Sequence, residues 1–174
     1  MRTLATVLAC VALAGCANPD VEVDVPDTIT VTSPAFAPDE EIPVDFSCAG
    51  RGASPPLGWT GAPEEARELA LVLDDPDAPR GTFIHWIVFA LPPSTNALAE
   101  NAVPSGAKLA KNTAGRAEYA PPCPPSGTHH YRFTVYALRA PLDLPNGADT
   151  DDALQAVSDQ AIAQGRLVGL FTAR

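Results

Sequence analysis

The chain has 174 residues, of which 46% are hydrophobic and 18% charged, so it is long enough for one domain with a core and is not a disordered chain. Its 11 Lys and Arg stand against 21 Asp and Glu, and the formal net charge of −10 argues against a nucleic-acid binder and against a protein held to anionic lipid by charge alone. Nineteen prolines disfavour a helical bundle, because proline has no backbone N–H, and they favour a strand-rich domain with many loops.

The first 16 residues predict an export signal. Arg2 precedes an apolar run over residues 4–13, which is too short to span a bilayer as a helix and has the layout of a secretory signal. The run LAGC, which ends at Cys16, resembles the lipobox of bacterial lipoproteins, where the cysteine becomes the new N-terminus and carries the lipid. An ordinary cleaved signal peptide with a chance cysteine is the alternative.

We therefore expect three parts: a lipoprotein signal peptide over residues 1–15, a lipidated Cys16 with an acidic tether over 16–27, and a folded domain over 28–174. The lipid would anchor the domain at the membrane of a bacterial cell envelope without an apolar patch of its own. Ala17 follows the cysteine, and under the lipoprotein sorting rule a residue other than Asp favours the outer membrane or periplasm over the inner membrane.

Short apolar or β-branched runs bounded by Pro, Gly and Asp predict strands. In chain order they cover residues 29–32, 43–47, 57–60, 69–73, 83–91, 131–138 and 166–172. The run over 83–91 is apolar on both faces and should lie centrally in a sheet. Strand alternation places His85 on one face with Phe83, Ile87 and Phe89.

One helix is expected over residues 151–164. Acidic residues favour its start, and Gly165 favours its end. Its expected apolar face consists of Leu154, Val157, Ala161 and Ile162. Several short strands, many prolines and one late helix predict a mostly β fold, a β-sandwich with a peripheral C-terminal helix and Pro-rich loops.

The cysteines divide into two groups. Cys10 would leave with the signal peptide and Cys16 would carry the lipid, so Cys48 and Cys123 remain in the domain. Two thiols in an exported domain favour a disulfide. Two buried free thiols are the alternative, because the sequence does not give their separation in space.

Two rigid loops each lead into a strand that carries histidine. The acidic loop over residues 74–79 precedes the strand of His85, and the Pro-rich loop over 121–125 precedes His129 and His130. Because proline fixes φ, such loops lose little entropy when a ligand binds. A histidine inside an apolar strand is also commonly a structural residue, and this reading stays open for His85.

Taken together, these runs resemble the phosphatidylethanolamine-binding protein (PEBP) family, in particular its bacterial Raf kinase inhibitor-like branch. The matching runs are TSPAF at 32–36, SPPL at 54–57, DDPDAPRG at 74–81, HW at 85–86, PCPPSGTH at 122–129 and Tyr131. They follow the family order from about residue 28 to the end. DPDAPRG followed by HW and then by PCPPSGTH is a strong joint signal.

The resemblance implies a PEBP-like β-sandwich with a small pocket for phosphate-bearing groups such as phosphoethanolamine, or for small anions. The ligand-binding residues that it implies are Asp75, His85, Trp86, Tyr119, Pro122, His129 and Tyr131. Imidazole N–H groups and a tyrosine hydroxyl can donate to phosphate oxygens, and protonated imidazoles bind them more strongly. Binding should therefore tighten as the pH falls through the imidazole range. Asp75 could orient a histidine tautomer or hold a ligand ammonium group.

Three residues depart from the family pattern. Pro121 and Ala120 stand where glycine is frequent, and His130 stands where arginine is frequent. The family uses backbone amides of this loop to hold the anion, and proline has no N–H to offer. Weaker anion binding or another pose is therefore expected.

The function expected is that of a non-catalytic envelope lipoprotein that binds a phosphate-type anion or head group, needs no cofactor or metal, and regulates an unknown envelope protein. Kinase inhibition is not carried over, because an exported protein does not meet cytoplasmic kinases. The alternative is a metal-dependent hydrolase, although the chain has no HExxH or GxSxG motif. Its candidate ligands are Asp74, Asp75, Asp77, His85 and His129.

A purely structural reading remains for parts of the acidic loop. Asp77 would make turn-capping hydrogen bonds within its own loop. Arg80 would be a local ion-pair partner of the carboxylates rather than a ligand residue.

Overall fold

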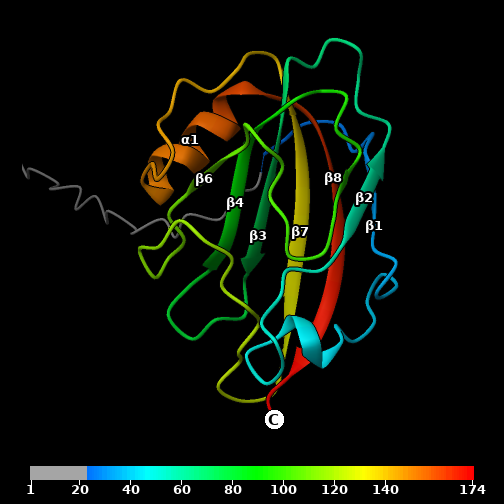
Figure 1. Ribbon diagram of the computed structural model, residues 1–174, viewed down its shortest axis with the longest axis vertical. Helices are drawn as coiled ribbons and strands as arrows, with labels where there is room; N and C mark the ends of the chain where they lie inside the picture. The colour runs from blue at the N-terminus through cyan, green and yellow to red at the C-terminus, as the bar shows by residue number, and fades with distance from the viewer. Residues whose placement is uncertain (1–22) are drawn as a thin grey trace, which may run out of the picture.

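The computed structural model describes residues 23–174, so the expected signal peptide, Cys16 and the first part of the tether lie outside the described residues. The elements are shown in Figure 1. They are β1 (Thr30–Thr32), the short 3-10 helix η1 (Val44–Phe46), β2 (Leu57–Thr60), β3 (Glu68–Asp75), β4 (Phe83–Leu91), β5 (Ala97–Leu98), β6 (Lys108–Ala110), β7 (Thr128–Leu138), α1 (Thr150–Gln160) and β8 (Ala161–Thr172). Within this part of the chain, neither helix has the length and apolar character needed to cross a membrane.

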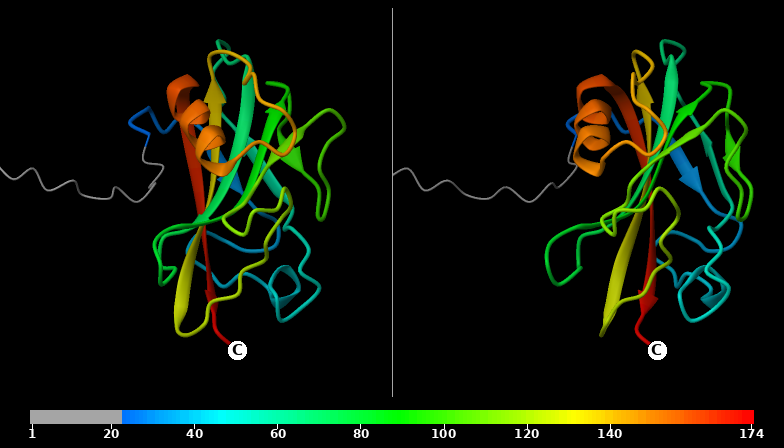
Figure 2. Two further views of the ribbon diagram at one scale, coloured as in Figure 1. Left: turned by 90° about the vertical axis from the view of Figure 1, so that its left-hand side faces the viewer. Right: turned by 60° about the vertical axis from the view of Figure 1, so that its left-hand side comes forward.

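Two antiparallel sheets and one helix form three layers. A five-stranded sheet has the order β6-β4-β3-β7-β8, and a three-stranded sheet has the order β1-β2-β5. Figure 2 shows α1 on one side of the long strands and the smaller sheet on the other. One apolar core, with Leu57 and Phe133, fills the space between the sheets, and a second, with Phe89 and Leu154, lies under α1. The expected mostly β fold with a peripheral helix is confirmed.

The most apolar runs form the centre of the larger sheet. β3 is buried at all eight positions, because β4 and β7 pair with its two edges and the two cores cover its faces. β4 has the bounds predicted from its sequence, and β7 begins three residues before the predicted strand over 131–138. β7 is therefore long enough to carry its first residues to the edge of the fold.

The prediction of a strand over residues 43–47 is wrong. These residues contain η1, and the Val44 carbonyl accepts both the N–H and the hydroxyl of Ser47. The serine side chain thus reinforces a tight turn that competes with strand pairing.

The predicted boundary between the helix and the last strand is also wrong. α1 ends at Gln160 rather than at residue 164, and β8 begins at Ala161 rather than at residue 166. From Ala161 onward, burial alternates along the strand, and Ala161 pairs with Leu138 of β7. Ala161 and Ile162 fit a helical stripe and a strand alternation equally well over so short a stretch, so the apolar pattern does not locate the boundary. Gly165 lies within β8 and ends no helix.

Replacing Ala90 with glycine should raise the free energy of unfolding by about 1 kcal/mol. Ala90 has φ of 57° near a shift in the pairing of β4 with β3, and its N–H donates to Glu68 Oε1 at 3.0 Å. This left-handed conformation is costly for alanine and free of steric cost for glycine. Urea unfolding measures the change. Ala97→Gly in β5, where φ is not positive, should instead lower stability, and equal losses in both variants would contradict the prediction.

Candidate functional site

Three strand ends and one loop meet where β7 begins. β3 ends at Asp75, β4 begins at Phe83, and the antiparallel pairing of both neighbours with β3 brings His85, His129 and Tyr131 to the same end of the sheet. A strap formed by residues 119–125 lies beside them. Together they enclose a cavity of about 500 Å³. Its polar lining residues are Asp75, Arg80, His85, His129 and Tyr131, and its apolar lining includes Phe83, Pro124 and Pro125.

A β-bulge aims His85 into this cavity. Leu73 pairs with Trp86 and Asp74 with Ile84, which leaves His85 as the extra residue of β4. The predicted common face with Ile87 and Phe89 is therefore wrong, since those two side chains belong to the core under α1. The His85 ring instead contacts Phe83, as predicted, with ring centroids 4.7 Å apart, and Tyr131, at 5.3 Å.

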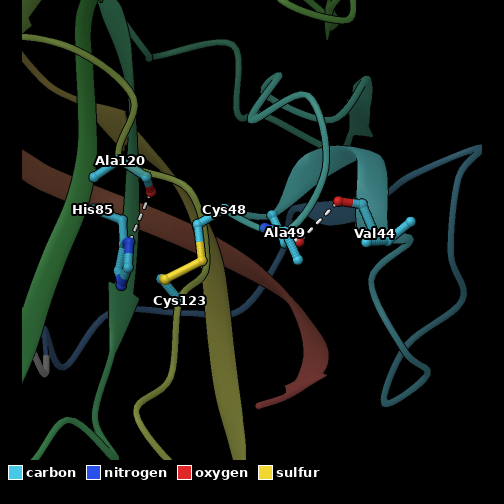
Figure 3. The surroundings of a disulfide bond; sticks show 7 residues. Val44, Cys48, Ala49, His85, Ala120 and Cys123 are labelled. Atoms are coloured by element: carbon cyan, nitrogen blue, oxygen red, sulfur yellow. Dashed lines mark hydrogen bonds between the residues drawn. A yellow bond between two sulfur atoms is a disulfide. The ribbon is translucent and has the colours of Figure 1, made fainter. Parts of the chain in front are cut away.

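The strap fixes the tautomer of His85. His85 Nδ1 lies 2.7 Å from the Ala120 carbonyl oxygen, and the Ala120 N–H donates back to the His85 carbonyl at 3.0 Å (Figure 3). Because a carbonyl oxygen accepts and never donates, Nδ1 carries the proton. Burial lowers the pKa of His85, with opposition from the Ala120 hydrogen bond and from Asp75, so the ring is neutral at neutral pH.

Asp75 orients the second histidine. His129 Nδ1 donates to Asp75 Oδ2 at 2.7 Å, and the Asp77 N–H donates to Asp75 Oδ1 at 2.9 Å. The side chains of Asp75 and His129 are almost fully buried. Of the two roles expected for Asp75, the structure supports orientation of a histidine, because both carboxylate oxygens already accept hydrogen bonds within the protein.

Tyr131 supplies a hydrogen-bond donor without a partner. Its side chain is fully buried, and within residues 23–174 its hydroxyl proton has no hydrogen-bond acceptor. Burial, followed by the charge of Asp75, raises the pKa of Tyr131 above its ordinary value, so the hydroxyl keeps its proton. A buried donor of this kind costs free energy unless a ligand or water accepts its bond.

The remaining carboxylates of the acidic loop are engaged outside the cavity. Asp74 forms a largely buried ion pair with Arg132, which faces it across the β3–β7 pairing. Asp77 Oδ2 accepts hydrogen bonds from the His130 N–H and from His130 Nδ1, both at 2.8 Å. The predicted capping of its own loop by Asp77 is therefore wrong, and Asp75 caps that turn instead.

Each aspartate among the candidate metal ligands is engaged by a different side chain of β7. Asp74, Asp75 and Asp77 have Arg132, His129 and His130 as respective partners. Across residues 23–174, no group of three His, Cys, Asp or Glu side chains has an arrangement that could hold a metal ion.

Three residues implied by the resemblance lie behind the cavity wall. Trp86 is 2% exposed and packs edge-on against Tyr119, whose hydroxyl donates to the Phe46 carbonyl at 2.9 Å. The Pro122 carbonyl accepts a hydrogen bond from the Cys48 N–H. The structure thus brings Asp75, His85, His129 and Tyr131 together in the cavity lining. Tyr119 and Pro122 instead attach the strap to the residues behind it, and Trp86 is one of the residues against which the strap packs.

A disulfide joins the strap to the segment after η1. Cys48 and Cys123 are bonded, with their Cα atoms 5.4 Å apart, and Figure 3 shows the bond beside the His85–Ala120 contact. The predicted disulfide is confirmed, and the alternative of buried free thiols is wrong, since both cysteines are exposed. Cys123 also lines the cavity.

Arg80 is a cavity residue that the sequence pattern does not predict. It is exposed and lines the cavity, whereas the buried partner of Asp74 is Arg132. Its place directly after the acidic loop, in the run DPDAPRG, was the available signal. Arg80 provides a fixed positive charge in the lining of the cavity that the two histidines also line.

Ala120 and Pro121, the two strap residues that stand where glycine was expected, offer the cavity no backbone N–H donor. The Ala120 N–H is used by the His85 carbonyl, and Pro121 has no N–H. At these two positions the strap therefore donates no backbone hydrogen bond to a ligand.

Comparisons with known proteins agree with this architecture. A family model described as phosphatidylethanolamine-binding protein matches residues 32–172. A Mycobacterium tuberculosis protein, LppC, provisionally named a lipoprotein, is 48% identical over 147 residues, which are 83% of this chain and 73% of that protein. A UPF0098 protein of Methanothermobacter thermautotrophicus is 42% identical over 142 residues, which are 79% of this chain and 94% of that protein.

Two solved structures have the same fold. A PEBP homologue from Chlamydia trachomatis superposes with a TM-score of 0.80 and 39% identity, covering 85% of this chain and 99% of that one. YbcL of Escherichia coli, described as a member of the mammalian PEBP family, has a TM-score of 0.80 and 27% identity, with coverage of 84% and 99%. Since the family model spans nearly the whole described domain and the identities extend over most of it, the chain belongs to the phosphatidylethanolamine-binding protein family.

Proposed function

We propose that this chain is a cell-envelope lipoprotein whose domain binds a phosphate-type oxyanion, free or as part of a head group, in the cavity at the start of β7. The observation that carries the proposal is the buried Tyr131 hydroxyl, which has no hydrogen-bond acceptor for its proton within residues 23–174 and lines the cavity with His85, His129 and Arg80. An oxyanion offers acceptors to the hydroxyl, and Arg80 contributes opposite charge.

The size and lining of the cavity favour a small ligand. About 500 Å³ accommodates a phosphate with a short substituent, and Phe83, Pro124 and Pro125 offer that substituent an apolar surface. The cavity has too little volume for the acyl chains of a lipid, so a free head group such as phosphoethanolamine, a phosphomonoester, is the larger ligand that we propose.

The proposed anchor rests on the sequence before the described residues and on the name of LppC. Val23 and Val25 pack near the core under α1, and Asp27 bridges to Gln164, which pairs with Tyr136 near the end of β7. The cavity lies at the other end of β7. A lipid on Cys16 would therefore be attached at the end of the fold away from the cavity.

We expect saturable 1:1 binding of inorganic phosphate and of phosphoethanolamine by the mature chain in a phosphate-free detergent, measured by calorimetric titration. Affinity should increase from pH 8 to pH 6, because an imidazolium binds an anion more strongly than a neutral imidazole does. EDTA should leave it unchanged. Absence of binding for both ligands, or affinity that does not vary with pH, would contradict the proposal.

Tyr131→Phe should weaken phosphate binding by at least about tenfold, because it removes a hydrogen bond to a charged group. Tyr136→Phe is the matched control, since Tyr136 is a buried tyrosine of the same strand in the core under α1. The control should keep the affinity of the unmodified chain. Equal losses in the two variants would show that the effect comes from stability rather than from the ligand.

A further inference from the structure

His85 presents a lone pair to the cavity rather than a proton. Its Nδ1 donates to the Ala120 carbonyl oxygen at 2.7 Å, so Nε2 of the neutral ring is a hydrogen-bond acceptor. In Figure 3 the second ring nitrogen points away from the Ala120 carbonyl, and none of residues 23–174 donates a hydrogen bond to it. The side chain is buried among the cavity residues, so a ligand there would meet this nitrogen.

Two other polar groups of the cavity have the opposite character. The Tyr131 hydroxyl and the Arg80 guanidinium are donors, and both oxygens of Asp75 already accept hydrogen bonds, from His129 Nδ1 and from the Asp77 N–H. The cavity therefore combines these donors with His85 Nε2, an acceptor to which none of residues 23–174 donates a hydrogen bond.

Charged and titratable side chains face His85 from the neighbouring strands β3 and β7. β3 contributes Asp74 and Asp75, and β7 contributes His129 with the neutral Tyr131. Arg80 lies on the loop before β4. The carboxylates favour a proton on His85, but burial has the larger effect and keeps its pKa below the ordinary value.

Building on the proposed function, we propose that His85 Nε2 is a specificity-determining acceptor, which makes the cavity select an oxyanion that still carries a proton. The P–OH of hydrogen phosphate or of a phosphomonoester monoanion would donate to Nε2, while its other oxygens accept from Tyr131 and Arg80. A sulfate, a sulfate ester or a phosphodiester has no such proton. An oxygen of such a ligand would face the lone pair of Nε2, and this buried acceptor would have no donor. The lost hydrogen bond makes binding of that ligand weaker, which is the source of the selectivity.

The selectivity is tested with two probes of the same shape and charge. Methyl phosphate monoanion and methyl sulfate differ in the one proton, and a phosphomonoester has its second pKa near 6. At pH 6, calorimetric titration of the mature chain should show at least about tenfold tighter binding of methyl phosphate. Dimethyl phosphate, a diester, should bind as weakly as methyl sulfate.

The outcomes separate this inference from the proposed function. Equal affinities for methyl phosphate and methyl sulfate would leave the oxyanion cavity in place and overturn the role of His85. Failure of both probes and of inorganic phosphate to bind would overturn both proposals. Tyr131→Phe should weaken both probes by the same factor and preserve their ratio, because its hydroxyl donates to either anion.

A spectroscopic measurement tests the tautomer without any variant. Nitrogen-15 NMR of the chain labelled at histidine should show His85 with a protonated Nδ1 and an unprotonated Nε2 at pH 7. Methyl phosphate should shift the Nε2 resonance, and methyl sulfate at the same concentration should leave it nearly unchanged. An Nε2–H tautomer in the free chain would overturn the inference.

Discussion

Replacing both Cys48 and Cys123 with serine should lower the free energy of unfolding by about 4 kcal/mol, as expected for a cross-link between residues 75 apart. The bond restricts the unfolded chain, which otherwise gains the entropy of an open loop of this length. It also joins the strap to the segment after η1. Guanidinium unfolding of the serine variant and of the unmodified chain, at one pH, measures the difference.

The exposure of the disulfide provides an internal control. Because both cysteines are exposed, a reducing agent should reach the bond and destabilise the unmodified chain by a similar amount. The serine variant should not respond to the reductant. A loss below about 1 kcal/mol in the variant would show that the disulfide contributes little beyond the contacts around it.

The strap has other attachments that should keep the variant folded. The Tyr119 hydroxyl donates to the Phe46 carbonyl, the Cys48 N–H donates to Pro122, and Ala120 exchanges two hydrogen bonds with His85. We therefore expect the serine variant to retain its fold while phosphate affinity falls, since the cavity wall at Cys123 loses its covalent attachment.

The apolar runs of the sequence determine most of this fold. The strand over 83–91 has the predicted bounds, and the runs over 69–73 and 131–138 form the interiors of β3 and β7. Such strands are readable because burial on both faces requires uninterrupted apolar residues. The short edge strands β5 and β6 were not predicted, because two or three residues carry too little pattern to distinguish them from loop.

The site depended on the resemblance more than on the pattern. Period-two alternation placed His85 with Ile87 and Phe89, and a single bulge reversed that relation. A bulge is a backbone event that leaves no mark on the apolar pattern of β4. The partner of Asp74 is likewise set by strand register, which pairs Asp74 with Arg132, whereas sequence proximity had favoured Arg80.

Gly165 is a second residue whose structural role the local sequence pattern does not predict. As a glycine following an apolar helical stripe, it had the features of a helix stop. In the structure it lies in β8, opposite Val135 of β7, where the backbone of Ile29 approaches the strand from its other edge. The requirement for glycine therefore comes from a segment far away in the sequence, which local rules do not detect.

Gly165→Ala should accordingly lower the free energy of unfolding by about 3 kcal/mol. A Cβ at this position would lie 1.7 Å from the Ile29 carbonyl oxygen, a backbone atom that no side-chain rotation can move. Relief requires the segment before β1 to detach, which breaks the hydrogen bonds from the Ile29 N–H to Gln164 and from the Gln164 N–H to Pro26. It also exposes the buried Ile29 side chain to water.

The matched control for this variant is Gly58→Ala in β2. There the nearest atom to a new Cβ is Thr32 Oγ1 at 3.6 Å, an ordinary contact, and φ is not positive. Alanine restricts the unfolded chain more than glycine does, so this substitution should leave stability unchanged or raise it by about 0.5 kcal/mol. Urea unfolding of the two variants at one pH separates close backbone approach from the general effect of removing a strand glycine. If Gly165→Ala were as stable as Gly58→Ala, the segment before β1 would not be held against β8 in solution.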